Sequence, residues 1–256
     1  MEFRGYNKNF ELADKVAFIT GGAAGIGKAI ASLFIEKNAH LALVDLNPKV
    51  RDIAAELSPD PGVALPLTCD ITTAEDRNRA VTATLQQFGR IDILVNNAGV
   101  AILEPALEVS EASWDRTLEL NLKAAFFLAQ RIGREMLSRG RGKIINIGSQ
   151  AGMVALDRHV AYMASKAAII GITKVLALEW ARAGVQVNAI SPTVVLTELG
   201  KKAWAGEVGE EFKRKLPAGR FAYPEEIAAA ALFLASDASD MMNGTNLVID
   251  GGYTIQ

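Results

Sequence analysis

The stretch VAFITGGAAGIGKAIASLF, residues 16–34, passes from an apolar, β-branched run through a glycine-rich turn into a segment of helical periodicity. This order is typical of a strand, a tight turn and a helix. Gly21, Gly25 and Gly27 lie in the turn, where glycine lets the chain bend sharply and lets phosphate oxygens approach main-chain N–H groups. The stretch therefore predicts a phosphate-binding turn at the start of an α/β sheet.

Similar short runs alternate with longer helical segments along the rest of the chain. The predicted strands are KVAFIT (15–20), HLALVDL (40–46), IDILVNNAG (91–99), GKIINIGS (142–149), VQVNAIS (185–191) and TNLVID (245–250), with one more strand before Asp70. Right-handed crossovers place helices on both faces of such a sheet. We expect an α/β protein with one doubly wound parallel sheet in a single domain, residues 1–256. Asn47-Pro48 and Tyr223-Pro224 predict helix starts, because each puts proline after a capping residue.

The composition excludes several classes of protein. Acidic and basic residues are interspersed and the net charge is -2, so the basic stripe of a nucleic-acid binder is missing. Residues 1–12 lack the apolar run of a signal peptide, and the longest apolar run identified, residues 227–235, is too short to span a membrane. We expect a soluble, cytoplasmic protein without metal, whose lone Cys69 is a small buried apolar residue.

Asp45 follows the second predicted strand, eighteen residues beyond Gly27. A carboxylate at this point of a dinucleotide-binding unit can hold the ribose hydroxyls of adenosine and repels a 2′-phosphate. No Arg or Lys directly follows it. The pattern predicts NAD rather than NADP as cofactor, with a simple turn at Asp45 as the alternative.

Tyr162 and Lys166 lie four residues apart in an apolar helical segment and therefore share one helix face. A free tyrosine loses its proton near pH 10, too high for a base at neutrality. A lysine one turn along supplies a positive charge that favours the phenolate and would lower the tyrosine pKa. The pair therefore predicts proton-transfer chemistry.

Four motifs together resemble the short-chain dehydrogenase/reductase family, over residues 15–253. They are the Gly-x-x-x-Gly-x-Gly turn, NNAG at residues 96–99, Ser149 thirteen residues before Tyr162, and Tyr162-x-x-x-Lys166. The resemblance implies a Rossmann fold and hydride transfer to a nicotinamide, with Tyr162 as the acid/base. It also implies that Ser149 binds the substrate oxygen, that Lys166 holds the nicotinamide ribose, and that Asn121 completes a water-mediated proton path. A helix-bending polar residue is the alternative for Asn121.

The resemblance also implies a set of cofactor contacts. They are Gly21, Gly25, Ile26, Gly27, Asp45, Asp70, Ile71, Asn97, Ala98, Gly99, Tyr162, Lys166, Pro192, Val195 and Thr197. Asn97 and Gly99 are expected on the adenosine side, and Asp70 could instead cap a helix. Thr193 replaces the glycine that the family usually has after this proline. Because a β-branched residue cannot adopt positive φ cheaply, we expect an altered nicotinamide site.

The substrate is indicated by a closer resemblance to L-xylulose reductases. PTVVLTELGKKAW (192–204), Gln150 after the serine and His159 before the tyrosine match that group. Amide, imidazole and indole groups at Gln150, His159 and Trp204 suit a short polyhydroxylated chain, although Gln150 and His159 could be polar loop residues at the edge of the site.

These matches predict an NAD-dependent oxidoreductase that interconverts a C4–C6 polyol and its ketose. A broad-specificity carbonyl reductase, a 3-oxoacyl reductase and a non-catalytic NAD-sensing module are the alternatives. The family implies a homotetramer, supported by apolar helices at residues 124–129 and 164–177. The charged, glycine-punctuated segment 196–219 is either a mobile substrate lid or a plain surface excursion.

Overall fold

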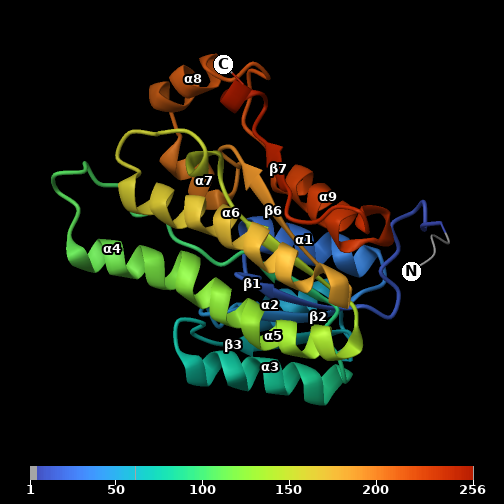
Figure 1. The fold of residues 1–256 in the computed structure, drawn as a ribbon. Helices are drawn as coiled ribbons and strands as arrows, with labels where there is room; N and C mark the ends of the chain where they lie inside the picture. Colours follow the sequence, from blue (N-terminus) through green and yellow to red (C-terminus); the bar gives the residue numbers. More distant parts are fainter. Residues whose placement is uncertain (1–4, 61, 256) are drawn as a thin grey trace.

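The computed structural model, which describes residues 5–60 and 62–255, contains a seven-stranded sheet between two layers of helices (Figure 1). The strand order is β3-β2-β1-β4-β5-β6-β7 and every neighbouring pair is parallel. The strands are β1 Val16–Thr20, β2 His40–Asp45, β3 Ala64–Thr68, β4 Ile93–Asn96, β5 Gly142–Ile147, β6 Val185–Pro192 and β7 Asn246–Ile249. The predicted doubly wound sheet and all of its predicted strands are confirmed.

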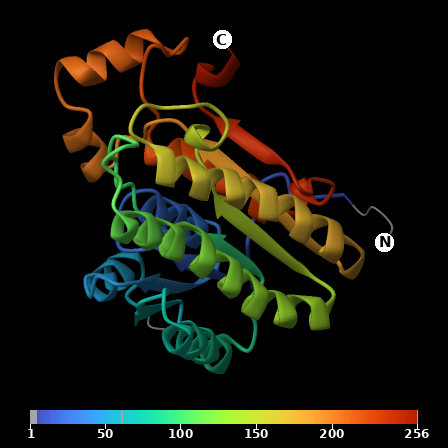
Figure 2. The same ribbon diagram turned by 60° about the vertical axis from the view of Figure 1, so that its left-hand side comes forward.

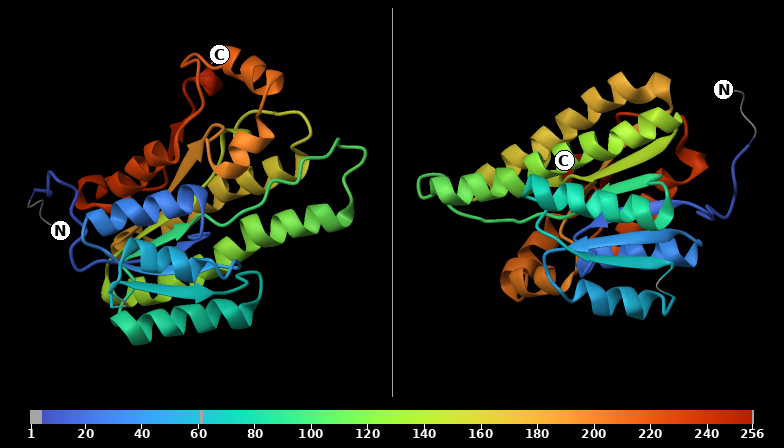
Figure 3. Two further views of the ribbon diagram at one scale, coloured as in Figure 1. Left: turned by 180° about the vertical axis from the view of Figure 1, so that it is seen from behind. Right: turned by 90° about the horizontal axis from the view of Figure 1, so that it is seen from below.

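Helices cover both faces of the sheet (Figures 2 and 3), and an apolar core lies between the sheet and the helices on each face. One core packs the strands against α1 Gly25–Glu36, α2 Val50–Leu57 and α9 Pro224–Ala235. The other packs them against α3 Ala74–Phe88, α5 Ala125–Arg139 and α6 Val160–Trp180. α4 Glu111–Leu118 continues into α5 through a π-helical turn, η1 Glu119–Ala124. α7 Glu198–Ala203 and α8 Glu207–Arg214 project beside the C-terminal turn (Figure 1).

The two predicted helix starts have different outcomes. α9 begins at Pro224 after Tyr223, whose N–H donates to the Glu226 carboxylate at 2.9 Å. The prediction at Asn47 is wrong, because α2 begins only at Val50. The Asn47 side chain accepts a hydrogen bond from the Lys49 N–H at 3.0 Å and stabilises a separate turn before the helix.

α6 corrects the expectation about apolar length. The segment Val160–Ala183 is long and apolar enough, by length and composition alone, to cross a membrane. This is weak evidence, because core helices of soluble proteins pass the same test. Buried α6 residues such as Leu176 and Ala177 pack into the core beneath the sheet.

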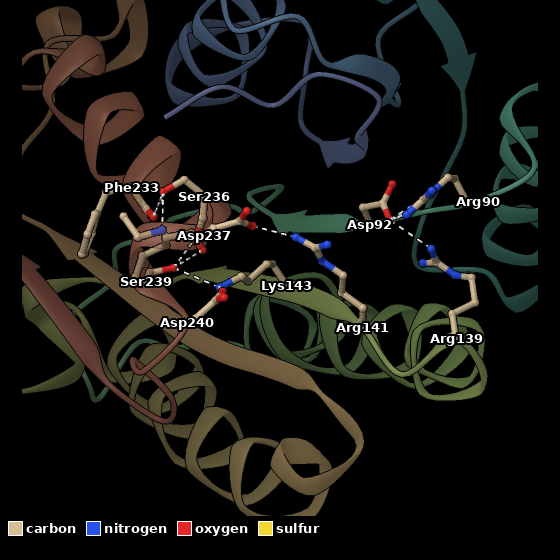
Figure 4. Close-up of polar contacts among 12 residues, drawn as sticks. Arg90, Asp92, Arg139, Arg141, Lys143, Phe233, Ser236, Asp237, Ser239 and Asp240 are labelled. Atoms are coloured by element: carbon tan, nitrogen blue, oxygen red, sulfur yellow. Dashed lines mark hydrogen bonds and ion pairs between the residues drawn. The ribbon is translucent and has the colours of Figure 1, made fainter. Parts of the chain in front are cut away.

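Charged residues join the elements at the amino ends of the central strands, the amino edge of the sheet (Figure 4). Asp92, one residue before β4, is 4% exposed and accepts hydrogen bonds from Arg90 Nε at 3.0 Å, Arg139 Nη1 at 3.0 Å and the Val16 N–H at 3.0 Å. Burial alone would raise the pKa of Asp92, but these hydrogen bonds outweigh it and hold the pKa below its ordinary value.

A second buried charge, Lys143, lies along the same amino edge as Asp92. Buried Lys143, on β5, donates to Asp240 at 2.7 Å and to Ser239 Oγ at 3.2 Å (Figure 4). Burial lowers the pKa of Lys143, and Asp240 opposes that change. Arg141 and Asp237 form a neighbouring exposed ion pair at 2.7 Å. The amino edge therefore ties β1, β4 and β5 to α5 and to the turn after α9.

Candidate active site

The glycine turn between β1 and α1 has the geometry expected of a phosphate-binding turn. Gly21 and Gly25 adopt φ of +67° and +55°, a region that favours glycine. A Cβ on Gly27 would lie 2.1 Å from the Gly21 carbonyl oxygen, so only glycine fits there. The turn therefore needs glycine for conformation at two positions and for close packing at the third.

A cleft of about 190 Å³ opens beside this turn, at the carboxyl ends of the strands. It is lined by Gly21, Val44, Asp45, Leu46, Cys69, Asp70, Ile71, Ala98, Gly99, Arg116 and Leu120. Six of these were predicted as cofactor contacts. Arg116 and Leu120, from α4 and η1, were not predicted, because their positions in the sequence resemble those of ordinary surface-helix residues. Burial raises the pKa of Cys69 to about 11, in keeping with a buried apolar role.

Asp45 both starts a turn and joins the glycine turn to β2. One carboxylate oxygen accepts from the Asn47 N–H at 2.9 Å and the other from the Ala23 N–H at 3.0 Å. A carboxylate oxygen has room for more than one donor. Asp45 therefore does start a turn, and as a cleft-lining carboxylate it has further acceptor capacity.

Asp70 is not a helix cap. Its Oδ1 accepts from the N–H and the hydroxyl of Thr72, at 3.0 and 2.7 Å, and these bonds lower the pKa of Asp70. The cap of α3 is Thr73, whose hydroxyl accepts from the Asp76 N–H at 3.2 Å.

The NNAG segment braces the glycine turn. The Asn97 side chain donates to the carbonyl oxygens of Thr20 at 2.9 Å and Gly21 at 3.2 Å, while the Ala98 N–H donates to Thr20 Oγ1 at 3.0 Å. A Cβ on Gly99 would lie 3.1 Å from Asn121 Oδ1 and 3.7 Å from Lys166 Nζ. The segment therefore links the cleft to the residues around Tyr162.

Ser149, Tyr162 and Lys166 lie together on α6 and the end of β5. Lys166 is buried, donates to the Ile147 carbonyl oxygen at 2.7 Å, and has its Nζ 5.6 Å from the Tyr162 ring centroid. Ser149 Oγ accepts from the Ala151 N–H at 3.1 Å and is hydrogen-bonded to Tyr162. The three predicted residues therefore share one site.

The pKa values of this group differ from the expectation. Burial raises the pKa of Tyr162, and the hydrogen bond with Ser149 opposes that rise. Burial also lowers the pKa of Lys166 to about 8. The expected lowering at the tyrosine is not found in these surroundings, because burial disfavours the charged forms of both groups.

Asn121 lies in the π-helical turn η1, a kind of distortion that is frequent at functional sites. Its amide accepts from the Val100 N–H and donates to the Val100 carbonyl oxygen, both at 2.8 Å. It also donates to Ser165 Oγ at 3.2 Å. Asn121 thus both occupies a distorted turn and connects the segment after β4 to α6.

Thr193, which replaces the family's usual glycine after β6, does not adopt a positive φ. The residues other than glycine with positive φ, among those described, are Phe10, Asp14, Asn38 and Arg158. Thr193 is therefore accommodated without the conformation that glycine would allow.

The segment that follows β6, residues 193–197, contacts the glycine turn through Thr197. Pro192 is the last residue of β6, and Val195 forms a parallel bridge with Ala222. Thr197 caps α7 by accepting from the Gly200 N–H at 3.0 Å, and its methyl group would lie 2.9 Å from a Cβ on Gly25.

The three predicted substrate residues occupy different surroundings. Gln150 is 2% exposed, and the His159 ring contacts the Tyr162 ring edge-on with a centroid distance of 5.9 Å. Trp204 instead packs against Phe212 and Phe221, at centroid distances of 4.7 and 5.9 Å. Gln150 and His159 thus lie beside the catalytic candidates, and Trp204 is part of an aromatic cluster that Leu156 also contacts.

Five buried side-chain oxygens have no hydrogen-bond partner within the described part of the chain. They are Thr68 Oγ1, Asn96 Oδ1, Glu104 Oε2, Gln150 Oε1 and Thr193 Oγ1. All five belong to the last residue of a strand or to the segment that follows it. Buried polar atoms are normally paired, and one of these oxygens belongs to Gln150, directly after Ser149, where a substrate hydroxyl could supply the partner.

Comparison with known proteins gives the same assignment as the geometry. A family model described as "Enoyl-(Acyl carrier protein) reductase" matches residues 21–254. The chain belongs to the short-chain dehydrogenase/reductase family. It is therefore an oxidoreductase, in agreement with the arrangement of Ser149, Tyr162 and Lys166.

Within the short-chain dehydrogenase/reductase family, the chain is 57% identical over 256 residues to an NAD-dependent glycerol dehydrogenase of Listeria innocua, with all of both chains covered. It is 55% identical to a D-threitol dehydrogenase of Mycolicibacterium smegmatis, covering 97% of this chain and 96% of the relative. Among solved structures, a gluconate 5-dehydrogenase from Burkholderia cenocepacia in complex with NADP and tartrate is similar, with a TM-score of 0.92 and 34% identity over 96% of this chain and 98% of that chain.

Proposed function

We propose that this enzyme is an NAD-dependent polyol dehydrogenase that oxidises a secondary hydroxyl of a sugar alcohol of about three to six carbons. The proposal rests on one observation. The buried Ser149 and Lys166 and the half-buried Tyr162 lie beside Gln150, whose amide oxygen is buried and has no hydrogen-bond partner among the described residues. Such a site suits a substrate with more than one hydroxyl, because a second hydroxyl can donate to the Gln150 amide oxygen, which is unfavourable when buried without a donor. The names of the two polyol dehydrogenase relatives support the same class of substrate.

The residues around the glycine turn fit a dinucleotide. A Cβ at Gly27 would collide with the Gly21 carbonyl oxygen and one at Gly25 with the Thr197 methyl group, and Asp45 is among the residues that line the cleft beside the turn. Gly21, Gly25 and Gly27 would hold the diphosphate, and Asp45 the adenosine ribose. When bound, the nicotinamide supplies the acceptor for hydride.

Tyr162 takes the proton from the substrate hydroxyl in this mechanism, and Ser149 positions the same oxygen by hydrogen bonding. Tyr162 and Lys166 titrate as a coupled pair, so removing one proton leaves either a neutral pair or a phenolate beside an ammonium. The lowered Lys166 pKa of about 8 brings this loss close to neutrality. Asn121 holds the segment after β4 next to α6 and completes the proton path.

We also propose a cytoplasmic homotetramer, in which exposed apolar side chains of α5 and α6 meet another copy. Phe127 is 40%, Val175 53% and Leu178 81% exposed, more apolar surface than these helices need within one chain. The segment 196–219, containing α7 and α8, is proposed to cover the substrate. The Tyr253 ring stacks on Phe212 at 5.1 Å and supports this cover from the C-terminal side.

The test is a screen of C3 to C6 polyols, ketoses, simple secondary alcohols and 3-oxoacyl thioesters with NAD and NADP. We expect the highest kcat/KM for a polyol with NAD. Faster turnover of acyl thioesters, or equal turnover of all secondary alcohols, would favour the acyl reductase or the general carbonyl reductase. Absence of turnover with tight NAD binding would indicate a sensing module, and light scattering measures the oligomeric state.

A further inference from the structure

Two of the oxygens without partners lie on adjacent segments at the active site. Gln150 is 2% exposed and Thr193 is 9% exposed, and neither Gln150 Oε1 nor Thr193 Oγ1 has a hydrogen-bond partner among residues 5–60 and 62–255. Burying a polar atom without a hydrogen-bond partner is unfavourable. Two such atoms beside a catalytic serine are therefore unfavourable until a ligand supplies the missing bonds.

The register of the sheet brings the two residues to the same level. β5 and β6 pair in parallel up to Ile147 and Ile190, and the Gly148 N–H continues the ladder by donating to the Ile190 carbonyl oxygen at 2.7 Å. Counted onward by the same offset, Gln150 corresponds to Thr193, although β5 itself ends at Ile147 and Gln150 begins the 3-10 turn Gln150–Gly152. Ser149, which is hydrogen-bonded to Tyr162, directly precedes Gln150.

The two atoms have complementary chemistry. An amide oxygen only accepts hydrogen bonds, whereas a threonine hydroxyl donates one and accepts others. They are not hydrogen-bonded to each other, since both are unpartnered. One alcohol hydroxyl could donate to Gln150 Oε1 and accept from the Thr193 hydroxyl, which an apolar group cannot do.

We propose that Gln150 and Thr193 together form a subsite for the hydroxyl next to the reacting carbon, and that Thr193 is a specificity-determining residue. The inference rests on the proposed polyol dehydrogenase function and deepens it. The position directly after Ser149 makes the neighbouring hydroxyl the one that is bound. Thr193 thereby contributes to substrate choice through its side chain at a position where the family usually has glycine.

The experiment compares a vicinal diol with its matched mono-alcohol, 2,3-butanediol and 2-butanol, using Thr193→Val and Thr193→Ser. In the wild type, kcat/KM should be higher for the diol. Thr193→Val keeps the shape but loses the hydroxyl, so the diol preference should fall about 3- to 10-fold, mostly through KM. Thr193→Ser should restore most of the preference. Thr84→Val, at a buried threonine on α3 bonded to the Ala80 carbonyl oxygen, controls for the substitution itself.

Each other outcome overturns the inference in a recognisable way. If Thr193→Val lowered kcat/KM equally for both alcohols and raised KM for NAD, the hydroxyl would serve the nicotinamide. If the diol preference survived unchanged, Thr193 would have no part in specificity, while polyol oxidation by the wild type would stand. If the wild type itself did not prefer the diol, the proposed function would fail together with the subsite.

Discussion

The amino edge and the carboxyl edge, meaning the two ends of the parallel strands, differ in how their buried polar groups are hydrogen-bonded. At the amino edge, Asp92 and Lys143 are buried and each is bonded to charged partners (Figure 4). At the carboxyl edge lie all five buried side-chain oxygens that lack partners within the described residues. At the amino edge the buried charges are bonded within the protein, whereas at the carboxyl edge Gln150 Oε1, directly after Ser149, lies where a substrate hydroxyl could supply the missing bond. Substitutions should therefore change stability at one edge and activity at the other.

The largest expected effect separates activity from stability at the carboxyl edge. Tyr162→Phe removes only the hydroxyl that transfers the substrate proton, so kcat/KM should fall by about 10²- to 10⁴-fold. NAD affinity and the midpoint of urea unfolding should change little, because the ring and its packing remain. Steady-state kinetics, cofactor titration and urea unfolding measure the three quantities. Retention of more than about a tenth of the activity would exclude Tyr162 as the acid/base, and Tyr223→Phe, at an exposed tyrosine, is the control.

The amino edge should show the reverse. Asp92→Asn leaves Arg90 and Arg139 without their carboxylate, and the free energy of unfolding should fall by about 2–4 kcal/mol with kcat/KM unchanged. The estimate lies toward the low end for a buried pair, because the Arg90 side chain is 42% exposed. Asp237→Asn, in the exposed pair with Arg141, should cost less than about 1 kcal/mol.

The same variant has a predictable pH dependence. The pKa of Asp92 is lower in the folded protein than in the unfolded chain, so the carboxylate stabilises the fold above its ordinary value of 3.8. That stabilisation is lost as pH falls through the lowered pKa. Urea unfolding curves of wild type and Asp92→Asn should therefore differ at pH 7 and converge in acid. A constant difference at every pH would show that the charge of Asp92 does not stabilise the protein.

A smaller effect is expected at Asp45, which both lines the cofactor cleft and accepts hydrogen bonds within the protein. Asp45→Ala should lower the kcat/KM preference for NAD over NADP by about 10-fold and also weaken the glycine turn, since two backbone N–H groups lose their acceptor. Asp45→Asn keeps a carbonyl oxygen for one of them and separates charge from turn stability. Equal use of both cofactors by the wild type would remove the basis of the NAD assignment.

The sheet was largely predictable because parallel strands are buried on both faces and therefore form continuous apolar runs. β3 was the hardest strand to define, since Pro66 lies in its middle. Its position explains this residue: β3 is at the edge of the sheet, where a strand tolerates a missing N–H. Asn47 misled for another reason, because the same side-chain acceptor stabilises a turn as readily as a helix start.

The sequence predicted which residues lie together in the site, because motif spacing determines their positions. It did not predict properties that depend on packing. Ser149, Tyr162 and Lys166 lie together as their spacing implied. The pKa values were not predictable, because burial acts on both Tyr162 and Lys166. Trp204 could not be placed from sequence, since its aromatic partners Phe212 and Phe221 lie beyond its own helix.

The π-helical turn at Glu119–Ala124 has a consequence for changes in chain length. An α-helix rotates by about 100° per residue, and a π-helical turn takes up one additional residue without breaking the helix. Deleting one residue here would restore α-helical phase and rotate α5 relative to α4 by roughly that angle. Phe127 would then leave its present face, and Asn121 could not keep both bonds to Val100. The long α4–α5 helix should therefore accept few insertions or deletions near Asn121.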